Sequence, residues 1–249
     1  EAAQLFAAMA GYDPADPLSL PDNGVDPLAR IGAPLAGLRV AIPTAYFNED
    51  VQAEVADAVD AAARVFERLG ARLVPVDLAD PEGLRAHRTF HFVLADVADA
   101  RRDVMACHGA ELGAEVRRRI VLGQQVSGQD YAAAIRALWR WKAELRGLFA
   151  ERADILLTPT CPVTAPLWRD SRDMVESTRR VARLTYDLGA SGIPSMSVPC
   201  GFDRTGLPIG MQLSAAWGRE DLLFQFGAGF QAAADHHHRH PAQFAELIE

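Results

Sequence analysis

The three serines in residues 191–197 are the strongest candidates for a nucleophile in this sequence. Ser191, Ser195 and Ser197 lie among glycines and prolines in SGIPSMSVPCGF. A serine attacks a carbonyl only when a neighbouring base takes its proton. GASGI lacks the second glycine of a G-x-S-x-G elbow, and a strand pattern follows where that elbow needs a helix. No His or Lys stands in a recognisable partner motif, so we interpret all three serines as turn and packing residues.

Histidine patterns give weak support for a metal site. His87 and His91 stand four residues apart on a predicted helix, but Arg88 occupies the place where a zinc protease has its general-base glutamate. The DHHHRH cluster at 235–240 lies beyond the last predicted helix, where adjacent histidines rarely build a closed tetrahedral site. A solvated or pocket-lining helix face explains the histidine pair better. We therefore expect neither a metal nor an organic cofactor.

Composition bounds the class of protein. The 249 residues suffice for one large α/β domain or two small ones. A net charge of −8 argues against nucleic-acid binding, which needs a basic face. No apolar run approaches the roughly 18 residues that span a bilayer, and the first residues lack the basic start of a signal peptide. Three widely spaced cysteines form no disulfide framework. We expect a cytoplasmic protein that binds neither nucleic acid nor membranes.

Alternating strand and helix patterns predict an α/β fold that would position any site. LRVAIP and ARLVPVDL predict strands on either side of a helix that begins near Val51 and ends at Gly70. This order is typical of a βαβ unit with parallel strands. DILLTP, SMSVPCGF and LPIGMQLSA predict three more strands. We expect one sheet, flanked by helices, with strands at 38–42, 72–77, 154–158, 195–200 and 207–213.

No linker clearly divides the chain, so we interpret residues 1–249 as a single domain. Ser127, with Asp130 three residues later, predicts the start of a helix. The segments are a lead-in helix and Pro-rich loop at 1–36, the βαβ unit at 37–80, helices at 82–150 with breaks near 109–113 and 123–128, and the remaining strands at 154–249 with helices at 175–188 and at the end.

Several of these motifs together resemble the C-terminal half of the amidase signature family. LLTPT and the pair IPSMSVPCGF and GLPIGMQL are the most specific, and LAGLRVAIPTAYF extends the likeness toward the start of the chain. The resemblance implies a mixed β-sheet flanked by helices and the hydrolysis of linear amide C–N bonds through a serine acyl-enzyme. The family's nucleophilic serine, its second serine with a cis peptide, and its lysine all belong to the N-terminal half. This chain has no Ser-Ser pair, and its single lysine, Lys142, does not match the catalytic one.

The resemblance therefore assigns no catalytic residue to this chain. We expect the nucleophile in sequence preceding Glu1, so that residues 1–249 form an incomplete amidase signature domain that is inactive by itself. An open strand edge and an apolar patch are expected where the other half would pack. The partner is expected to be a small-molecule amide, and the helical segment 82–150 offers a surface for a homodimer.

By the same resemblance, several residues are expected near the substrate. In glutamine-using members, the arginine before the isoleucine of EVRRRIVLG holds a substrate carboxylate; here it is Arg119, for which a structural role at helix ends is equally open. Ala182 replaces an acidic residue of the proteins that take ammonia from glutamine, which favours a general amidase over the A subunit of a transfer-RNA amidotransferase. A non-catalytic module that kept the scaffold is the competing class. The expected pocket residues are Thr158, Thr160, Tyr186, Gly189 (where many members have Asn) and Ser191.

Overall fold

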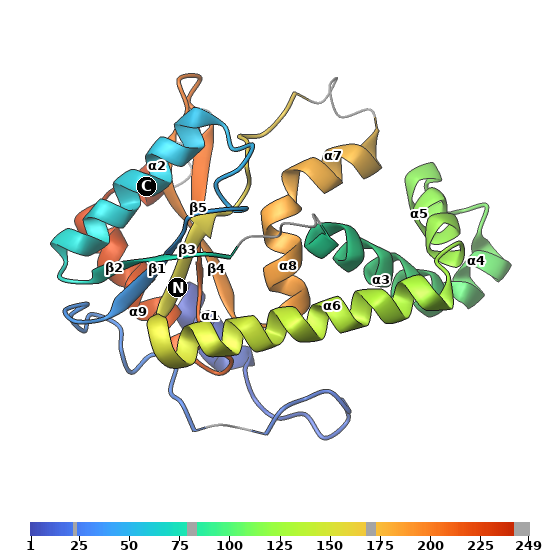
Figure 1. Cartoon of the computed structure of the whole chain (residues 1–249), viewed down its shortest axis with the longest axis horizontal. Helices are drawn as coiled ribbons and strands as arrows, with labels where there is room; N and C mark the ends of the chain where they lie inside the picture. The colour runs from blue at the N-terminus through green and yellow to red at the C-terminus, as the bar shows by residue number, and fades with distance from the viewer. Residues whose placement is uncertain (22–23, 79–83, 168–172, 242–249) are drawn as a thin grey trace.

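The computed structural model describes residues 1–21, 24–78, 84–167 and 173–241, without the side chains of 84–90 and Met174. Within these residues, a five-stranded mixed sheet forms the centre of the molecule (Figure 1). The order is β2-β1-β3-β5-β4; β1 is parallel to β2 and β3, and β5 is antiparallel to β3 and β4. The predicted α/β fold is confirmed. The strands are β1 (Arg39–Pro43), β2 (Arg72–Val76), β3 (Ile155–Pro159), β4 (Ser195–Phe202) and β5 (Pro208–Ser214).

Helices cover both faces of the sheet (Figure 1). In the described residues, the segment predicted at 82–150 contains four helices rather than three, because a further break occurs at Arg101. The helix predicted at 175–188 is split at Ala182. None of the helices described is long and apolar enough to cross a membrane. They are α1 (Ala2–Met9), α2 (Ala53–Arg68), α3 (Leu84–Ala100), α4 (Arg102–His108), α5 (Ala114–Gln124), α6 (Gly128–Gly147) with the π-helical turn η1 (Leu148–Arg152), α7 (Met174–Val181), α8 (Arg183–Ser191), α9 (Glu220–Ala233) and the 3₁₀ turn η3 (His236–His238).

One face of the sheet is covered by α2 and α9, which share a hydrophobic core. Val55, Val59 and Phe66 recur on one side of α2 at helical spacing and are buried. The Phe66 ring packs against Phe226 and Phe230 of α9, with ring centroids 5.3 and 5.6 Å apart. Burying each of these rings stabilises the fold by about 1.5–3 kcal/mol. The apolar face predicted for this helix is therefore the face that meets the sheet.

The opposite face of the sheet is covered by α6 and α8. Leu145 of α6, Leu188 of α8 and Leu156 of β3 belong to one buried cluster. The indole Nε1 of Trp141 donates a hydrogen bond to the backbone oxygen of Asp187 at 3.0 Å. This bond joins the middle of α6 to α8, and α8 is thereby held over the sheet.

Helices α3 to α6 form an arm that extends to one side of the sheet (Figure 1). The predicted cap at Ser127 is present, since its Oγ accepts a hydrogen bond from the backbone N of Asp130 at 3.1 Å. Gly123 of α5 lies against α3: a Cβ there would be 2.7 Å from the carbonyl carbon of Leu94 and 2.8 Å from the Cβ of Ala98. The missing side chain at this position is what lets the two helix backbones approach each other.

Arg39 and Asp154 join the beginnings of β1 and β3. The carboxylate of Asp154 accepts hydrogen bonds from the backbone N of Arg39 at 2.8 Å and from its Nε and Nη2 at 3.2 and 3.1 Å. Burial alone would raise the pKa of Asp154, but the hydrogen bonds from Arg39 lower it overall. The two residues are 115 positions apart, and the helical arm lies between them in the sequence. The pair therefore joins β1 and β3 on either side of that insertion.

Strand β4 forms an open edge of the sheet. In the described part of the chain it pairs only with β5. Ser195, Ser197 and Pro199 point to one side of this edge and are exposed. The open edge was expected, and two of the three exposed residues on this part of β4 are serines. The expected apolar patch stays a prediction. Large apolar side chains are exposed elsewhere, as at Met9 and Leu18, where 76% and 85% of the residue surface is accessible.

Candidate functional site

The carboxyl ends of strands β1, β3 and β4 lie on the same side of the sheet, because β5 is antiparallel to both β3 and β4. We call this side the carboxyl edge, which is distinct from the unpaired edge along β4. Thr160 extends the ladder, since its backbone N donates to the backbone oxygen of Gly210 at 2.9 Å. The chain then continues through segment 163–166. In open α/β sheets, ligands bind in the crevice outside the carboxyl ends of the strands. The fold therefore predicts a binding site at this edge.

Hydroxyl and amide side chains line one face of β3, β5 and β4 near this edge. Thr158 lies opposite Gln212, and Gln212 lies opposite Ser197. Nε2 of Gln212 donates to Oγ1 of Thr158 at 3.3 Å, and the hydroxyls of Thr160 and Ser197 are 2.8 Å apart. Thr158 and Gln212 are buried, whereas Ser197 is exposed. We call Thr158, Thr160, Ser197 and Gln212 the polar cluster.

The three candidate nucleophiles are hydrogen-bonded to groups that are not bases. The Ser195 hydroxyl lies 2.8 Å from that of Ser214, and the Ser197 hydroxyl bonds Thr160. The Ser191 hydroxyl is buried and donates to the backbone oxygen of Leu188 at 2.6 Å. Within the described residues, none of these hydroxyls bonds a histidine, a lysine or a carboxylate. This arrangement cannot deprotonate a serine for attack.

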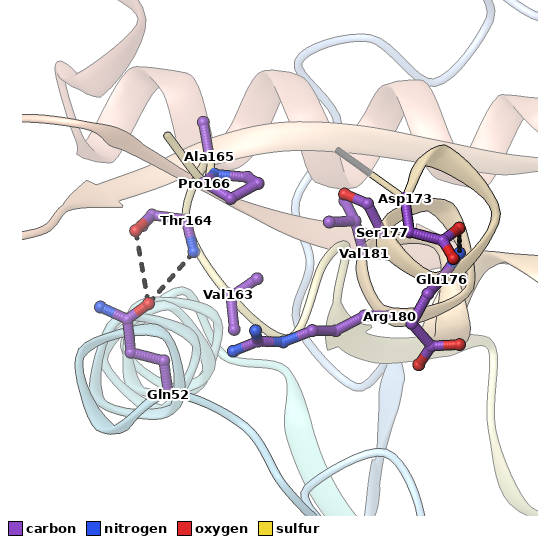
Figure 2. A pocket seen from close by; sticks show the side chains of 10 residues that line it. All are labelled: Gln52, Val163, Thr164, Ala165, Pro166, Asp173, Glu176, Ser177, Arg180 and Val181. Atoms are coloured by element: carbon purple, nitrogen blue, oxygen red, sulfur yellow. Dashed lines mark hydrogen bonds between the residues drawn. The ribbon is translucent and has the colours of Figure 1, made fainter. Parts of the chain in front are cut away.

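Two hollows flank segment 163–166. The apolar hollow, of about 370 Å³, lies beside the polar cluster and has Cys161, Pro199 and Ile209 among its walls. The α7 hollow, of about 350 Å³, lies between the same segment and α7 (Figure 2). Its lining residues are Gln52, Val163, Thr164, Ala165, Pro166, Asp173, Glu176, Ser177, Arg180 and Val181.

Thr164, in the wall shared by the two hollows, is fixed by two other parts of the chain. Its backbone N donates to Oε1 of Gln52 at 3.2 Å, and its hydroxyl donates to Oδ2 of Asp203 at 2.8 Å. Asp203 lies in the turn between β4 and β5. Hydrogen bonds, first from the Thr205 hydroxyl and then from Leu207 and Thr164, lower the pKa of Asp203 to about 2. An ionised carboxylate therefore holds this wall in place.

We expect Asp203→Asn to loosen segment 163–166 in a pH-dependent way. The folded pKa of about 2 lies below the ordinary 3.8, so the carboxylate stabilises the fold above about pH 4, and this stabilisation disappears as the pH falls toward 2. Melting temperatures of the original chain and the variant should differ most above about pH 4 and converge near pH 2. Amide exchange at Thr164 should be faster in the variant at neutral pH. A melting difference that persists unchanged at pH 2 would contradict this role.

Comparison with known proteins identifies the family. The family model described as Amidase matches residues 1–224, which include all five described strands and the start of α9. This chain belongs to the amidase signature family. Over 274 aligned residues, the amidase chain is 32% identical to the A subunit of the glutamyl-tRNA(Gln) amidotransferase of Thiobacillus denitrificans, and the match covers 98% of this chain and 55% of that protein.

Solved structures agree with the fold. The amidase chain superposes on 6-aminohexanoate cyclic dimer hydrolase with a TM-score of 0.79 at 23% identity, over 96% of this chain and 54% of that one. It superposes on the A subunit of the glutamyl-tRNA(Gln) amidotransferase of Thermotoga maritima with a TM-score of 0.64 at 27% identity, over 86% of this chain and 46% of that one. The chain spans about half the length of the relatives it matches.

The structure separates the predicted pocket residues of this chain into groups. Thr158 and Thr160 belong to the polar cluster at the carboxyl edge of the sheet. Tyr186 and Gly189 lie on α8 and line a different hollow, of about 440 Å³, which they share with Phe92 and Val93 of α3. Ser191 ends α8 and is fully buried. The residues to which the resemblance pointed therefore lie in three places: at the carboxyl ends of the strands, in the hollow between α3 and α8, and buried at the end of α8. In the described residues, these places do not form one continuous pocket.

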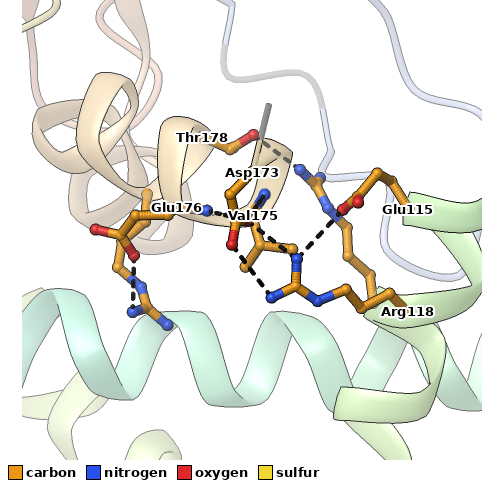
Figure 3. A network of polar contacts seen from close by, with 8 residues as sticks. Glu115, Arg118, Asp173, Val175, Glu176 and Thr178 are labelled. Carbon is orange, nitrogen blue, oxygen red and sulfur yellow. Dashed lines mark hydrogen bonds and ion pairs between the residues drawn. The ribbon is translucent and has the colours of Figure 1, made fainter. Parts of the chain in front are cut away.

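Arg119 lies where α5 meets α7. Its Nη2 donates to the hydroxyl of Thr178 on α7 at 2.8 Å (Figure 3). The neighbouring Arg118 binds the carboxylate of Asp173 at 3.0 and 3.4 Å. Asp173 also accepts hydrogen bonds from the backbone N of Val175 and Glu176 and so caps α7. The two arginines thus fix the start of α7 against α5.

Metal ligands do not gather in the described part of the chain, where no group of three His, Cys, Asp or Glu side chains could hold an ion. The side chain of His87, one member of the predicted histidine pair, lies outside the described residues, and His91 is half-buried on α3. The 236–238 histidines form a 3₁₀ turn, in which His236 stacks on Phe230 with ring centroids 6.1 Å apart.

The three cysteines should react with iodoacetamide at clearly different rates. Cys107 is exposed, Cys161 is half-buried in the apolar hollow with a pKa raised by burial, and Cys200 is buried with a pKa raised to about 12. Because the thiolate is the reacting species, labelling should follow the order Cys107, Cys161, Cys200. Mass spectrometry of the labelled peptides over time measures these rates. Equal rates at Cys107 and Cys161 would show that the apolar hollow does not exclude solvent.

Gln212, Thr164 and Arg180 were not anticipated from the sequence. Gln212 is a polar residue inside the apolar run IGMQLSA, and a buried amide of this kind is a usable signal for a polar site. Thr164 and Arg180 carry no such signal. Thr164 depends on contacts with residues about 40 and more than 100 positions away.

Proposed function

We propose that this chain supplies the pocket-forming half of an amidase that hydrolyses linear amide C–N bonds through a serine acyl-enzyme. The nucleophile and its base would belong to the other half, and this chain alone would be inactive. Family membership over residues 1–224 supports the reaction class. The observation that supports placing the nucleophile in the other half is that no described serine of the 191–197 segment contacts a base.

The polar cluster and the apolar hollow suit an amide substrate. An amide offers one carbonyl acceptor and, when primary or secondary, N–H donors, and hydroxyl and carboxamide side chains can bond both. Thr160 and Ser197 lie at the wall of the apolar hollow, which leaves apolar surface for the substituent of the amide. A concave apolar site with a few placed polar groups is the usual form of a small-molecule pocket.

A second candidate is the A subunit of a glutamyl-tRNA(Gln) amidotransferase, which the 32% identity to such a protein favours. Ala182 weighs against it. This residue forms the break between α7 and α8, next to Val181 of both hollows, and presents a methyl group where a carboxylate is expected for the ammonium group of glutamine. We therefore favour a general amidase. A non-catalytic module is the remaining class.

The test is an amide panel on the complete protein, in which this chain follows its N-terminal sequence. Ammonia or amine release should be measured from aliphatic amides, anilides and glutamine, with and without a chelator. Release from simple amides, unaffected by the chelator, supports the proposed function. Release from glutamine alone favours the amidotransferase, and no release from any amide favours a binding module.

A further inference from the structure

Arg180 of α7 places a cation in the α7 hollow. Its side chain extends from the helix across the hollow toward Val163 and Gln52 (Figure 2). In the part of the chain that the structure describes, its guanidinium makes no ion pair and no hydrogen bond. A guanidinium left in a hollow without a carboxylate partner is suited to bind an anion that enters it.

The two carboxylates that line the same hollow are already paired. Asp173 binds Nη1 of Arg118 at 3.0 Å, and Glu176 binds Nη1 of Arg179 at 3.4 Å (Figure 3). Arg118 also lies 3.7 Å from Oε2 of Glu115, so two carboxylates share its charge. Among the described residues that line the α7 hollow, Arg180 is therefore the cation that no carboxylate pairs.

Ser177 adds a hydroxyl donor on the same side of the helix. It precedes Arg180 by three residues, and side chains at this spacing share one face of an α-helix. Both residues line the α7 hollow, and the described residues contain no hydrogen-bond partner for the Ser177 hydroxyl. Helix α7 thus presents one hydroxyl and one guanidinium to the same space.

We propose that Arg180 and Ser177 bind a carboxylate of the substrate, so that the preferred amides carry a carboxylate away from the bond that is cleaved. This inference rests on the proposed function. A planar guanidinium matches a carboxylate in two parallel hydrogen bonds. One cation beside two acidic side chains suits a singly charged anion better than a doubly charged phosphate. The α7 hollow and the apolar hollow have residues 163–166 and Val181 in common among their lining residues, so the two hollows are adjacent.

The position of Arg180 differs from that of Arg119, the arginine to which the resemblance assigned a carboxylate. Arg119 bonds Thr178, and residues 178 and 180 project from opposite sides of α7 because successive residues turn by about 100°. The side of the helix that faces Arg119 is therefore not the side that faces the α7 hollow. We assign the anion to Arg180 on this ground.

Two matched amides test the assignment in the complete enzyme: succinamate, which ends in a carboxylate, and butyramide, which ends in a methyl group. Arg180→Gln should lower kcat/KM for succinamate about tenfold or more, mainly by raising KM, because a charge-assisted hydrogen bond is lost. The value for butyramide should change less than about twofold. Arg180→Lys should keep part of the preference, since it retains the charge without the planar fork.

Arg68→Gln is the matched control. It removes the same charge from the exposed far end of α2 and should leave the ratio of the two substrates unchanged. An equal loss for succinamate and butyramide in Arg180→Gln, or no loss for either, would overturn the carboxylate site.

A binding experiment separates this inference from the proposed function. Calorimetric titration of the complete protein with butyrate should show binding that Arg180→Gln abolishes, even if no amide in the panel is cleaved. Inorganic phosphate should bind more weakly than butyrate. If butyrate does not bind, or if phosphate binding depends on Arg180 to the same extent, the assignment to a carboxylate is wrong. Failure of the amide panel alone would count only against the proposed function.

Discussion

The chain by itself is expected to release ammonia from amides no faster than solvent does, whereas the complete protein is expected to be at least about 10⁶-fold faster. An acyl-enzyme requires a nucleophile that a neighbouring base has activated. In the described residues, Ser191, Ser195 and Ser197 bond a backbone oxygen and two other hydroxyls. Lys142 lies on α6, and no hydrogen bond links it to them. Assays of ammonia release from a primary amide, on the chain and on the complete protein, measure this difference.

Alanine variants in the complete protein give the control. Ser197→Ala removes one hydroxyl of the polar cluster and should lower kcat/KM by about tenfold or less, which is the size expected for one binding hydrogen bond. Removing a nucleophile would instead lower kcat by about 10⁴-fold or more. A loss of that size in Ser191→Ala, Ser195→Ala or Ser197→Ala would mean that the nucleophile lies in this chain.

Gly123→Ala is expected to destabilise the helical arm by about 3 kcal/mol and to lower the melting temperature by roughly 6–12 °C. The new Cβ would meet the backbone oxygen of Leu94 and would lie 2.8 Å from the Cβ of Ala98. A backbone carbonyl within a helix cannot rotate away as a flexible side chain can, so α3 and α5 would have to separate. Thermal denaturation followed by circular dichroism measures the effect.

Gly147→Ala is the matched control for that substitution. Gly147 ends α6 with helical torsion angles, and a Cβ there would have no neighbour within 4 Å. The same change should therefore stabilise the chain by about 0.5–1 kcal/mol through the lower flexibility of the unfolded state. If both variants shift the melting temperature in the same direction by similar amounts, the close approach of α3 and α5 is wrong.

The strands and most helix ends could be predicted because they depend on neighbouring residues. Apolar runs bounded by Gly, Pro and Asp predicted all five strands of the described residues, and Ser127 predicted the start of α6. The breaks at Arg101 and Ala182 could not be predicted in this way. Neither residue is a strong helix breaker, so the sequence carries no local signal for either break.

The candidate site was only partly predictable. Thr158 and Thr160 follow from a motif in one strand, but their contacts with Gln212 and Ser197 depend on the register between strands far apart in sequence. Arg179 and Arg180 are neighbours of the same type, yet one pairs with Glu176 and the other faces the α7 hollow. Helix periodicity separates them, but only the packing of α7 shows which one faces the hollow.

The ion pair between Arg39 and Asp154 has a consequence for how the chain folds during synthesis. It joins the first and third strands across 115 positions, and the helical arm lies between them. The arm makes most of its contacts between helices close in sequence, so it can form as soon as its own residues have left the ribosome. Strands β1 and β2 must wait for β3 before the middle of the sheet exists, because pairing between distant segments is slow. The sheet at the centre of the molecule is therefore expected to be assembled after the arm that projects from it.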